Sequence, residues 1–191
     1  MKIAYFDCFA GISGDMTLGA LISAGADPEL LRERLAGLGV TGFRIEWGKK
    51  MAGYIEATDV RVILDETHHP HHRHLAGILE IIGRADLSGR VKRTAEGIFR
   101  RLAEAEGKVH GHSAEEVHFH EVGALDAIVD IVGTALCLEM LGWPKVVASP
   151  MPTFHGFVKG SHGLFPLPAP ATVELLRGVP WRKLDIEGEL V

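Results

Sequence analysis

The chain has 191 residues, long enough for one domain with a substantial hydrophobic core. Its composition of 47% hydrophobic and 24% charged residues is typical of a globular protein. A formal net charge of -5, without a basic stripe, argues against nucleic acid or an anionic membrane as the main partner. Asp7 interrupts any signal-peptide core, and no apolar run reaches the roughly 18 residues of a membrane span. With two cysteines, too few for a disulfide framework, we expect a cytoplasmic protein.

Predicted strands and helices follow one another in the first half of the chain. The apolar run 2–6 predicts a buried strand, "FAGISGDM" a glycine-rich turn, and residues 17–24 a helix. A second helix is expected over 29–38. The segments "FRIEW" and "YIEATDVRVIL" alternate as strands do, with a turn around 48–53 between them. These elements predict an α/β fold of the α+β type, in which helices cover a mixed β-sheet.

Helices dominate the second half. Apolar periodicity predicts helices over 75–84 and 88–106, the second with Ser88 as its N-cap, and the most apolar helix of the chain over 122–141. The remaining predicted elements are a strand over 145–148, a long irregular segment over 150–170, a short helix ending at Arg177, and a last strand within "LDIEGELV". A Pro- and Gly-rich irregular segment of that length is unusual in a compact domain unless it has a function.

The His-rich run "HHPHHRH", residues 68–74, lies inside the chain, so it is not a terminal tag. It contains His68, His69, His71, His72 and His74. Neutral imidazole is the commonest metal ligand among side chains, and short His-rich tracts are typical of metal binding. Such a loop would bind nickel, copper and zinc alike. The alternative is a solvated loop that is merely rich in histidine.

A second group of metal-binding residue types surrounds the apolar helix over 122–141. Asp126, Asp130, Thr134 and Cys137 follow at steps of four, four and three, which places them on one stripe. The lead-in "VHFHE" adds His118, His120 and Glu121. Nitrogen and carboxylate ligands together suit a divalent cation. The alternative is that the stripe is only the solvent-facing line of a nearly buried helix.

The glycine-rich turn could bind phosphate, because small residues before a helix expose backbone N–H groups at its positive end. Gly11, Ser13 and Gly14 would supply those groups, whereas Ser13 or Asp15 could instead simply cap the helix. Asp7 follows the first strand, where carboxylates commonly face a ligand crevice. The neighbouring Cys8 is either a thiolate ligand or an inert buried thiol.

The Pro- and Gly-rich segment "FHGFVKGSHGLFPLPAPAT" carries His155, Lys159 and His162. Two imidazoles and an ammonium on a loop favour contact with an anionic ligand or a metal. The alternative is an irregular lid with incidental histidines.

Three separated motifs, "YFDCFAGISGDMTLGALISAG", "HFHEVGALDAIVDIVG" and "HGLFPLPAPATVELLRG", resemble the LarC family of nickel insertion proteins. The resemblance covers residues 1–181, so 182–191 are expected to begin a connection to a further domain. Family proteins carry a His-rich segment of variable length where "HHPHHRH" stands, which implies a nickel-gathering loop. They also continue well past residue 191, and CTP, with Mg²⁺ or Mn²⁺, is expected to bind in that later half.

The resemblance implies a nickel-inserting enzyme of the lyase class, a chelatase or cyclometallase. Its substrate would be pyridinium-3,5-bisthiocarboxylic acid mononucleotide, and its product the nickel-pincer cofactor used by lactate racemase. Expected partners are the sulfur-inserting enzyme, lactate racemase apoprotein and further copies of the chain. The expected residues are Asp7, Asp15, Asp126 and Asp130 for catalysis; Gly11, Ser13, Gly14, Lys159 and His162 for substrate binding; and the His-rich run, His118, His120 and Glu121 for nickel.

Two other functions remain open at this level. The His-rich run would equally suit a nickel-storing metallochaperone without turnover. Asp7, Asp15, Asp126 and Asp130 would suit a phosphohydrolase that holds Mg²⁺ or Mn²⁺ between hard carboxylates.

Overall fold

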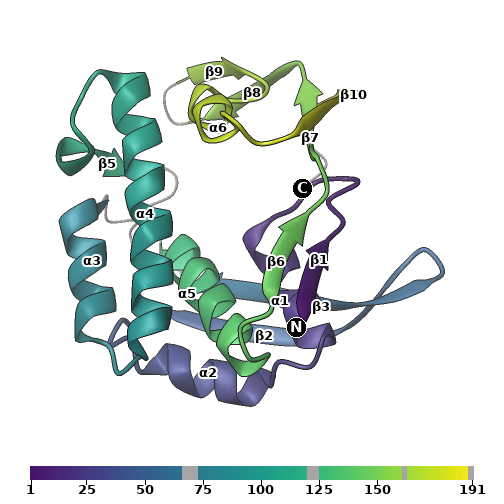
Figure 1. Ribbon diagram of the computed structural model, residues 1–191, viewed down its shortest axis with the longest axis vertical. Coiled ribbons are helices and arrows are strands. Elements are labelled where there is room, and N and C mark those ends of the chain that lie inside the picture. The colour runs from purple at the N-terminus through teal and green to yellow at the C-terminus, as the bar shows by residue number, and fades with distance from the viewer. Residues whose placement is uncertain (66–72, 120–124, 161–162, 189–191) are drawn as a thin grey trace.

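The computed structural model describes residues 1–65, 73–119, 125–160 and 163–188 (Figure 1). Its helices are α1 (Gly14–Ser23), α2 (Pro28–Ala36), α3 (Leu75–Arg84), α4 (Gly89–His110), α5 (Leu125–Met140) and α6 (Pro170–Leu175), with a 3₁₀ turn, η1 (Ala114–Glu116). Its strands are β1 (Ile3–Phe6), β2 (Phe43–Ala52), β3 (Ile55–Leu64), β4 (Arg73–His74), β5 (His118–Phe119), β6 (Lys145–Ala148), β7 (Met151–His155), β8 (Phe157–Gly160), β9 (Gly163–Pro166) and β10 (Trp181–Glu187). None of these helices is both long and apolar enough to cross a membrane.

The predicted α/β class is confirmed, and both kinds of strand pairing occur. Within the described residues the strands pair in twos: β1 with β6 and β7 with β10 are parallel, whereas β2–β3, β4–β5 and β8–β9 are antiparallel. Sequence periodicity shows which residues are extended but not which edges meet. The mixed sheet expected from the sequence is therefore divided into small sheets.

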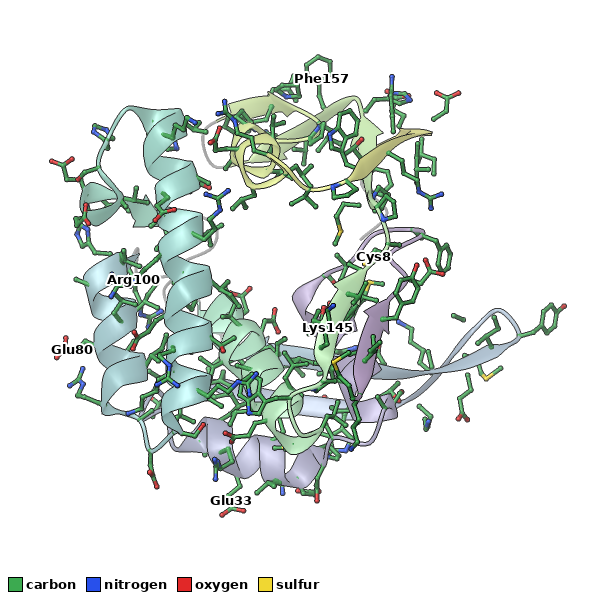
Figure 2. All side chains as sticks on the ribbon, in the orientation of Figure 1. Cys8, Glu33, Glu80, Arg100, Lys145 and Phe157 are labelled. Atoms are coloured by element: carbon green, nitrogen blue, oxygen red, sulfur yellow. The ribbon has the colours of Figure 1, made fainter. Side chains whose placement is uncertain are left out.

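The core lies where α5 meets α1, α2, α4 and β3. Leu18, Leu31, Phe99, Ile128 and Val132 are fully buried there. Figure 2 shows Glu33 and Glu80 on the outer sides of α2 and α3, pointing away from this core. Burial of aliphatic and aromatic side chains at this junction is the main force that holds the helices around α5.

Side-chain caps fix where several helices begin. The Ser88 hydroxyl accepts from the backbone N–H of Val91 and caps α4, as predicted. Asp27 caps α2 by accepting from the N–H of Glu29 at 2.9 Å. At its other end α4 stops at Gly111, whose φ of 72° is the left-handed conformation that glycine adopts without strain.

Two expected segments differ from the structure. Gly48 lies within β2, and the hairpin turns at Gly53 and Tyr54 instead. The segment 150–170 is not wholly irregular, because β7, β8 and β9 occupy most of it. The prolines of this segment interrupt the alternating pattern that is typical of a strand. In addition, β7 pairs with β10, which lies far along the chain, so periodicity alone does not predict this pairing.

The part of the chain from β7 to β10 stands at the top of Figure 1, above the core. Two side-chain contacts between described residues help to join it to the rest. The Lys108 ammonium on α4 lies 2.6 Å from the Glu174 carboxylate on α6. The Arg182 guanidinium donates to the backbone carbonyl of Phe9 at 3.1 Å. The second contact ties β10 to the glycine-rich turn, residues 9–16.

The contact of α1 with β3 predicts the stability of glycine variants. A Cβ on Gly19 would lie 2.5 Å from the backbone carbonyl oxygen of Thr58, whereas one on Gly97 in α4 would meet nothing within 4 Å. We expect Gly19→Ala to lower the free energy of unfolding by about 1–3 kcal/mol, as overpacking does. Gly97→Ala should raise it by up to about 1 kcal/mol through helix propensity. Urea unfolding measures both, and a Gly19→Ala variant as stable as wild type would contradict the packing.

Candidate functional site

Helix α1 begins directly against the Asp130 carboxyl of α5. A Cβ placed on Gly14 would lie only 2.2 Å from Asp130 Oδ2, so no other amino acid fits at this position without moving α5. The glycine predicted to bind phosphate is thus required for helix packing. Phosphate binding at its N–H stays a prediction.

The first turn of α1 is capped by its own side chains. Ser13 Oγ accepts from the backbone N–H of Met16 at 3.4 Å, and an Asp15 carboxylate oxygen accepts from the same group at 2.7 Å. The Ser13 hydroxyl also donates to the Asp15 carboxylate. The capping role that the sequence left open for Ser13 is confirmed, and Asp15 sits where the helix dipole favours negative charge.

Three carboxyl groups form an acid cluster: Asp15 from α1, and Asp126 and Asp130 from α5. One oxygen of Asp130 is buried and has no hydrogen-bond partner among the described residues. Burial, with smaller contributions from the charges of Asp15 and Asp126, raises the pKa of Asp130 to about 7. A carboxyl with that pKa can hold or release a proton near neutral pH, as a general acid or base does.

The stripe predicted on α5 does not face solvent along its whole length. Cys137 is fully buried, and burial raises the pKa of its thiol to about 12, so it packs as a small apolar side chain. Asp126 and Asp130 are partly buried. The solvent-facing alternative therefore does not describe this helix.

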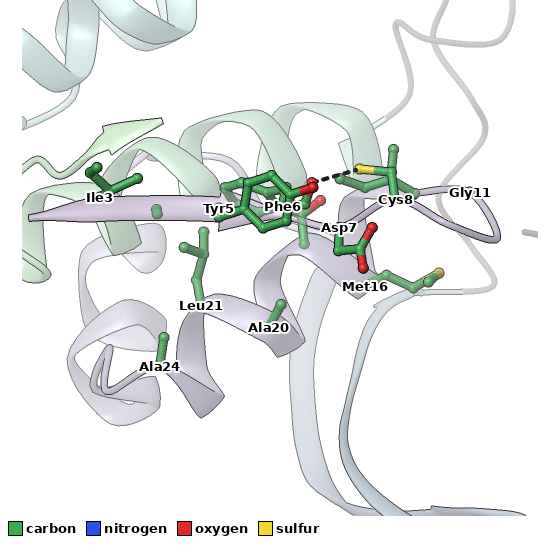
Figure 3. A pocket seen from close by; sticks show the side chains of 13 residues that line it. Ile3, Tyr5, Phe6, Asp7, Cys8, Gly11, Met16, Ala20, Leu21 and Ala24 are labelled. Atoms are coloured by element: carbon green, nitrogen blue, oxygen red, sulfur yellow. Dashed lines mark hydrogen bonds between the residues drawn. The ribbon is translucent and has the colours of Figure 1, made fainter. Parts of the chain in front are cut away.

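Asp7 and Cys8 lie just beyond β1, beside a cavity of about 400 Å³ between β1 and α1 (Figure 3). Asp7 is exposed, and its charge is not among those that shift the pKa of Asp130. Cys8 is buried; its N–H donates to Ser149 Oγ at 2.9 Å and its thiol contacts the Phe6 carbonyl at 3.8 Å. Burial and the Asp7 charge raise the pKa of Cys8, which favours the inert thiol over the thiolate ligand.

His74 and His118 lie together, although 44 positions separate them in the printed sequence. They are opposite residues of the antiparallel pair β4–β5, with ring centroids 3.7 Å apart, and both are exposed. β4 directly follows the segment 66–72, and β5 directly precedes the segment 120–124. The two predicted metal-binding regions therefore meet at this pair of imidazoles, a pairing that no periodicity in two-residue strands could predict.

Several predicted site residues lie outside the described part of the chain: His68, His69, His71, His72, His120, Glu121 and His162. Among the residues that are described, no three His, Cys, Asp or Glu side chains are grouped to hold a metal ion. The predicted single cluster from His118 to Asp130 is thus not formed by described residues alone. What they do form is an imidazole pair and, separately, an acid cluster.

The segment from β7 to β10 places its basic residues differently. Lys159 is exposed on β8. His155 Nε2 lies 3.2 Å from the Asp185 carboxylate and lines a cavity of about 550 Å³. Arg177, Trp181 and Lys183 line it as well. These three residues were not predicted as site residues from the sequence. The signal that could have indicated them is that Trp181 and Lys183 alternate along β10.

The raised pKa of Asp130 predicts the pH dependence of stability. The folded chain holds the Asp130 proton more tightly than the unfolded chain does, so this carboxyl favours folding at low pH. That contribution is lost as pH rises from about 4 to about 7. We expect Asp130→Asn to gain stability relative to wild type over this range, measured by urea unfolding at several pH values. A stability difference between Asp130→Asn and wild type that does not change with pH would contradict the burial of Asp130.

The family model described as "Nickel insertion protein" matches residues 4–191. A protein of Desulfitobacterium hafniense, named pyridinium-3,5-bisthiocarboxylic acid mononucleotide nickel insertion protein, is 53% identical over 190 residues, covering 100% of this chain and 47% of its own length. A protein of the same name from Acetivibrio thermocellus is 48% identical over 200 residues, covering 100% of this chain and 49% of its own. The chain thus spans about half the length of these relatives, and no solved structure matches it. It belongs to the family of nickel insertion proteins.

Proposed function

We propose that this chain forms the nickel-handling half of a protein that inserts nickel into pyridinium-3,5-bisthiocarboxylic acid mononucleotide. Membership of the nickel insertion family supports this function, because the two relatives described above are named for inserting nickel into this mononucleotide. The observation within the structure that carries it is the contact of His74 with His118 at the meeting point of two ligand-rich segments. Two adjacent imidazoles suit a borderline divalent ion such as Ni²⁺.

Nickel is the substrate in this proposal, and the two His-containing segments divide its handling. Residues 68–72 bring four more imidazoles in sequence up to β4 and collect the ion. His74 and His118, held on paired backbone, fix its position better than a loop can. His120 and Glu121, directly after β5 in sequence, complete the ligand set.

The acid cluster supplies the acid–base chemistry. When a carbon–nickel bond replaces a ring carbon–hydrogen bond, a proton must leave the ring. Asp130, with its pKa raised to about 7, is the carboxyl best suited to accept it. Burial of Asp130 is the main cause of that raised pKa, and the negative charges of Asp15 and Asp126 add to it.

Further parts of the proposal rest on the resemblance to the LarC family. They are CTP with Mg²⁺ or Mn²⁺ as co-reactant of the longer protein, the lyase class, supply of the cofactor to lactate racemase, contact with the sulfur-inserting enzyme, self-association and a cytoplasmic location. Because the chain spans about half of its relatives, turnover is assigned to a protein of their full length.

Nickel affinity should depend on the imidazole pair. We expect His74→Ala and His118→Ala each to weaken Ni²⁺ binding at least about tenfold, whereas the exposed control His112→Ala should bind as wild type does. Wild-type affinity should fall as the pH is lowered, because imidazole must lose its proton to coordinate. Calorimetric titration at several pH values measures both. Equal affinity in all four proteins, or binding that persists to about pH 5 as carboxylates allow, would contradict the pair as ligands.

Turnover should separate the two clusters. In a protein of the relatives' full length that contains this chain, Asp130→Asn should lower product formation at least about a hundredfold at saturating nickel, because it removes a general base. In the same protein, His74→Ala should raise the nickel concentration needed and leave the saturated rate near wild type. Mass spectrometry of the nickel-bearing mononucleotide gives both rates. If His74→Ala lowers the saturated rate and Asp130→Asn only raises the nickel concentration needed, the two roles are reversed. Nickel binding without any product would favour the storage function. Release of phosphate from simple esters would favour the phosphohydrolase function.

A further inference from the structure

Two cavities lie next to each other in the part of the chain from β7 to β10. The larger, of about 550 Å³, lies between β7, α6 and β10. The smaller, of about 260 Å³, shares Phe154, Leu167 and Leu176 with it and reaches Gly11 and Ile12 of the glycine-rich turn. A volume of this size is typical of a site for one small molecule. Because they share these residues, the two cavities lie side by side, and we call the pair the cavity path.

One end of this path is basic. His155, Arg177 and Lys183 line the larger cavity, and none of its described lining residues is acidic. The Arg177 guanidinium lies 2.9 Å from the Glu174 carboxylate. His155 Nε2 lies 3.2 Å from the Asp185 carboxylate. Within the described part of the chain, the Lys183 ammonium forms no ion pair. An ammonium that lines a cavity without such a partner attracts an anionic group such as phosphate.

The part that the two cavities share is mostly apolar. Phe154 is partly buried and lines both cavities together with Leu167 and Leu176. On β10, Trp181 and Lys183 are two residues apart, so their side chains leave the strand on the same side. An aromatic wall next to a cation suits a ligand with a flat ring and a phosphate, and aromatic faces attract cationic rings especially.

We propose that this path is the binding site of the pyridinium mononucleotide substrate. The phosphate binds at Lys183 and Arg177, and the pyridinium ring lies against Phe154, with its free edge toward Gly11 and Ile12. This inference rests on the proposed function, which supplies the class of ligand. It assigns the phosphate to β10 and to the turn after α6, in place of the backbone N–H groups of the glycine-rich turn. In that turn the Gly11 N–H donates to the Cys8 carbonyl at 3.2 Å, and the Met16 N–H is used in capping α1.

Nicotinic acid mononucleotide and its riboside test this placement, because they differ only in the phosphate. Calorimetric titration of the 191-residue chain should show the mononucleotide binding at least about tenfold more tightly than the riboside. Lys183→Gln should abolish most of that difference without changing riboside affinity. The matched control Lys145→Gln, on β6 and outside both cavities, should keep it. Phe154→Leu, with its fold checked by circular dichroism, should weaken binding of both ligands.

The proposal is overturned if wild type does not distinguish the two ligands, or if Lys183→Gln retains the full difference between them. Nickel titration of the same samples keeps this result separate from the proposed function. Mononucleotide binding that needs Lys183, in a chain whose imidazole pair binds no nickel, would support the pocket and contradict nickel handling. Normal nickel binding, together with a mononucleotide affinity that neither Lys183→Gln nor Phe154→Leu changes, would support nickel handling and contradict the pocket.

Discussion

The close packing of α1 against α5 is the constraint on which the candidate site depends. It is made by two glycines, one on each helix. Gly14 leaves room for the Asp130 carboxyl, and a Cβ on Gly133 would lie 3.0 Å from Leu18 Cδ2. Because the helices approach this closely, Asp130 is removed from water and placed near Asp15. The raised pKa of Asp130 is thus a consequence of helix packing, and the same contact holds the glycine-rich turn between β1 and α1.

The other functional regions are tied to this frame through α4, α5 and the glycine-rich turn. α4 packs on α5 and α3, and α3 follows β4, so the imidazole pair is set by the same core. α4 also carries the ion pair between Lys108 and Glu174, which fixes α6 beside the larger cavity. Arg182 binds the Phe9 carbonyl from β10. The imidazole pair, the acid cluster and the cavity path are therefore parts of one framework.

Local patterns in the sequence predicted what local physics decides. The helix over 75–84, the cap at Ser88 and the strand over 145–148 are found where periodicity and capping place them. Asp126 and Asp130 lie on the same side of α5, as their spacing of four residues predicts. Contacts between distant segments were beyond such reasoning: the β4–β5 pair spans two residues on each side, and β7 pairs with β10 across the Pro-rich segment. The meeting of His74 with His118, and the cavity beside Trp181, follow from those contacts.

The central claim is that nickel is held where the two His-containing segments meet. Anomalous diffraction at the nickel absorption edge, from crystals of the chain soaked in Ni²⁺, tests it most directly because it locates the ion without assuming its ligands. We expect a nickel peak within coordination distance of His74 and His118. A peak at the carboxylates of Asp126 and Asp130 with none at the imidazole pair would contradict it.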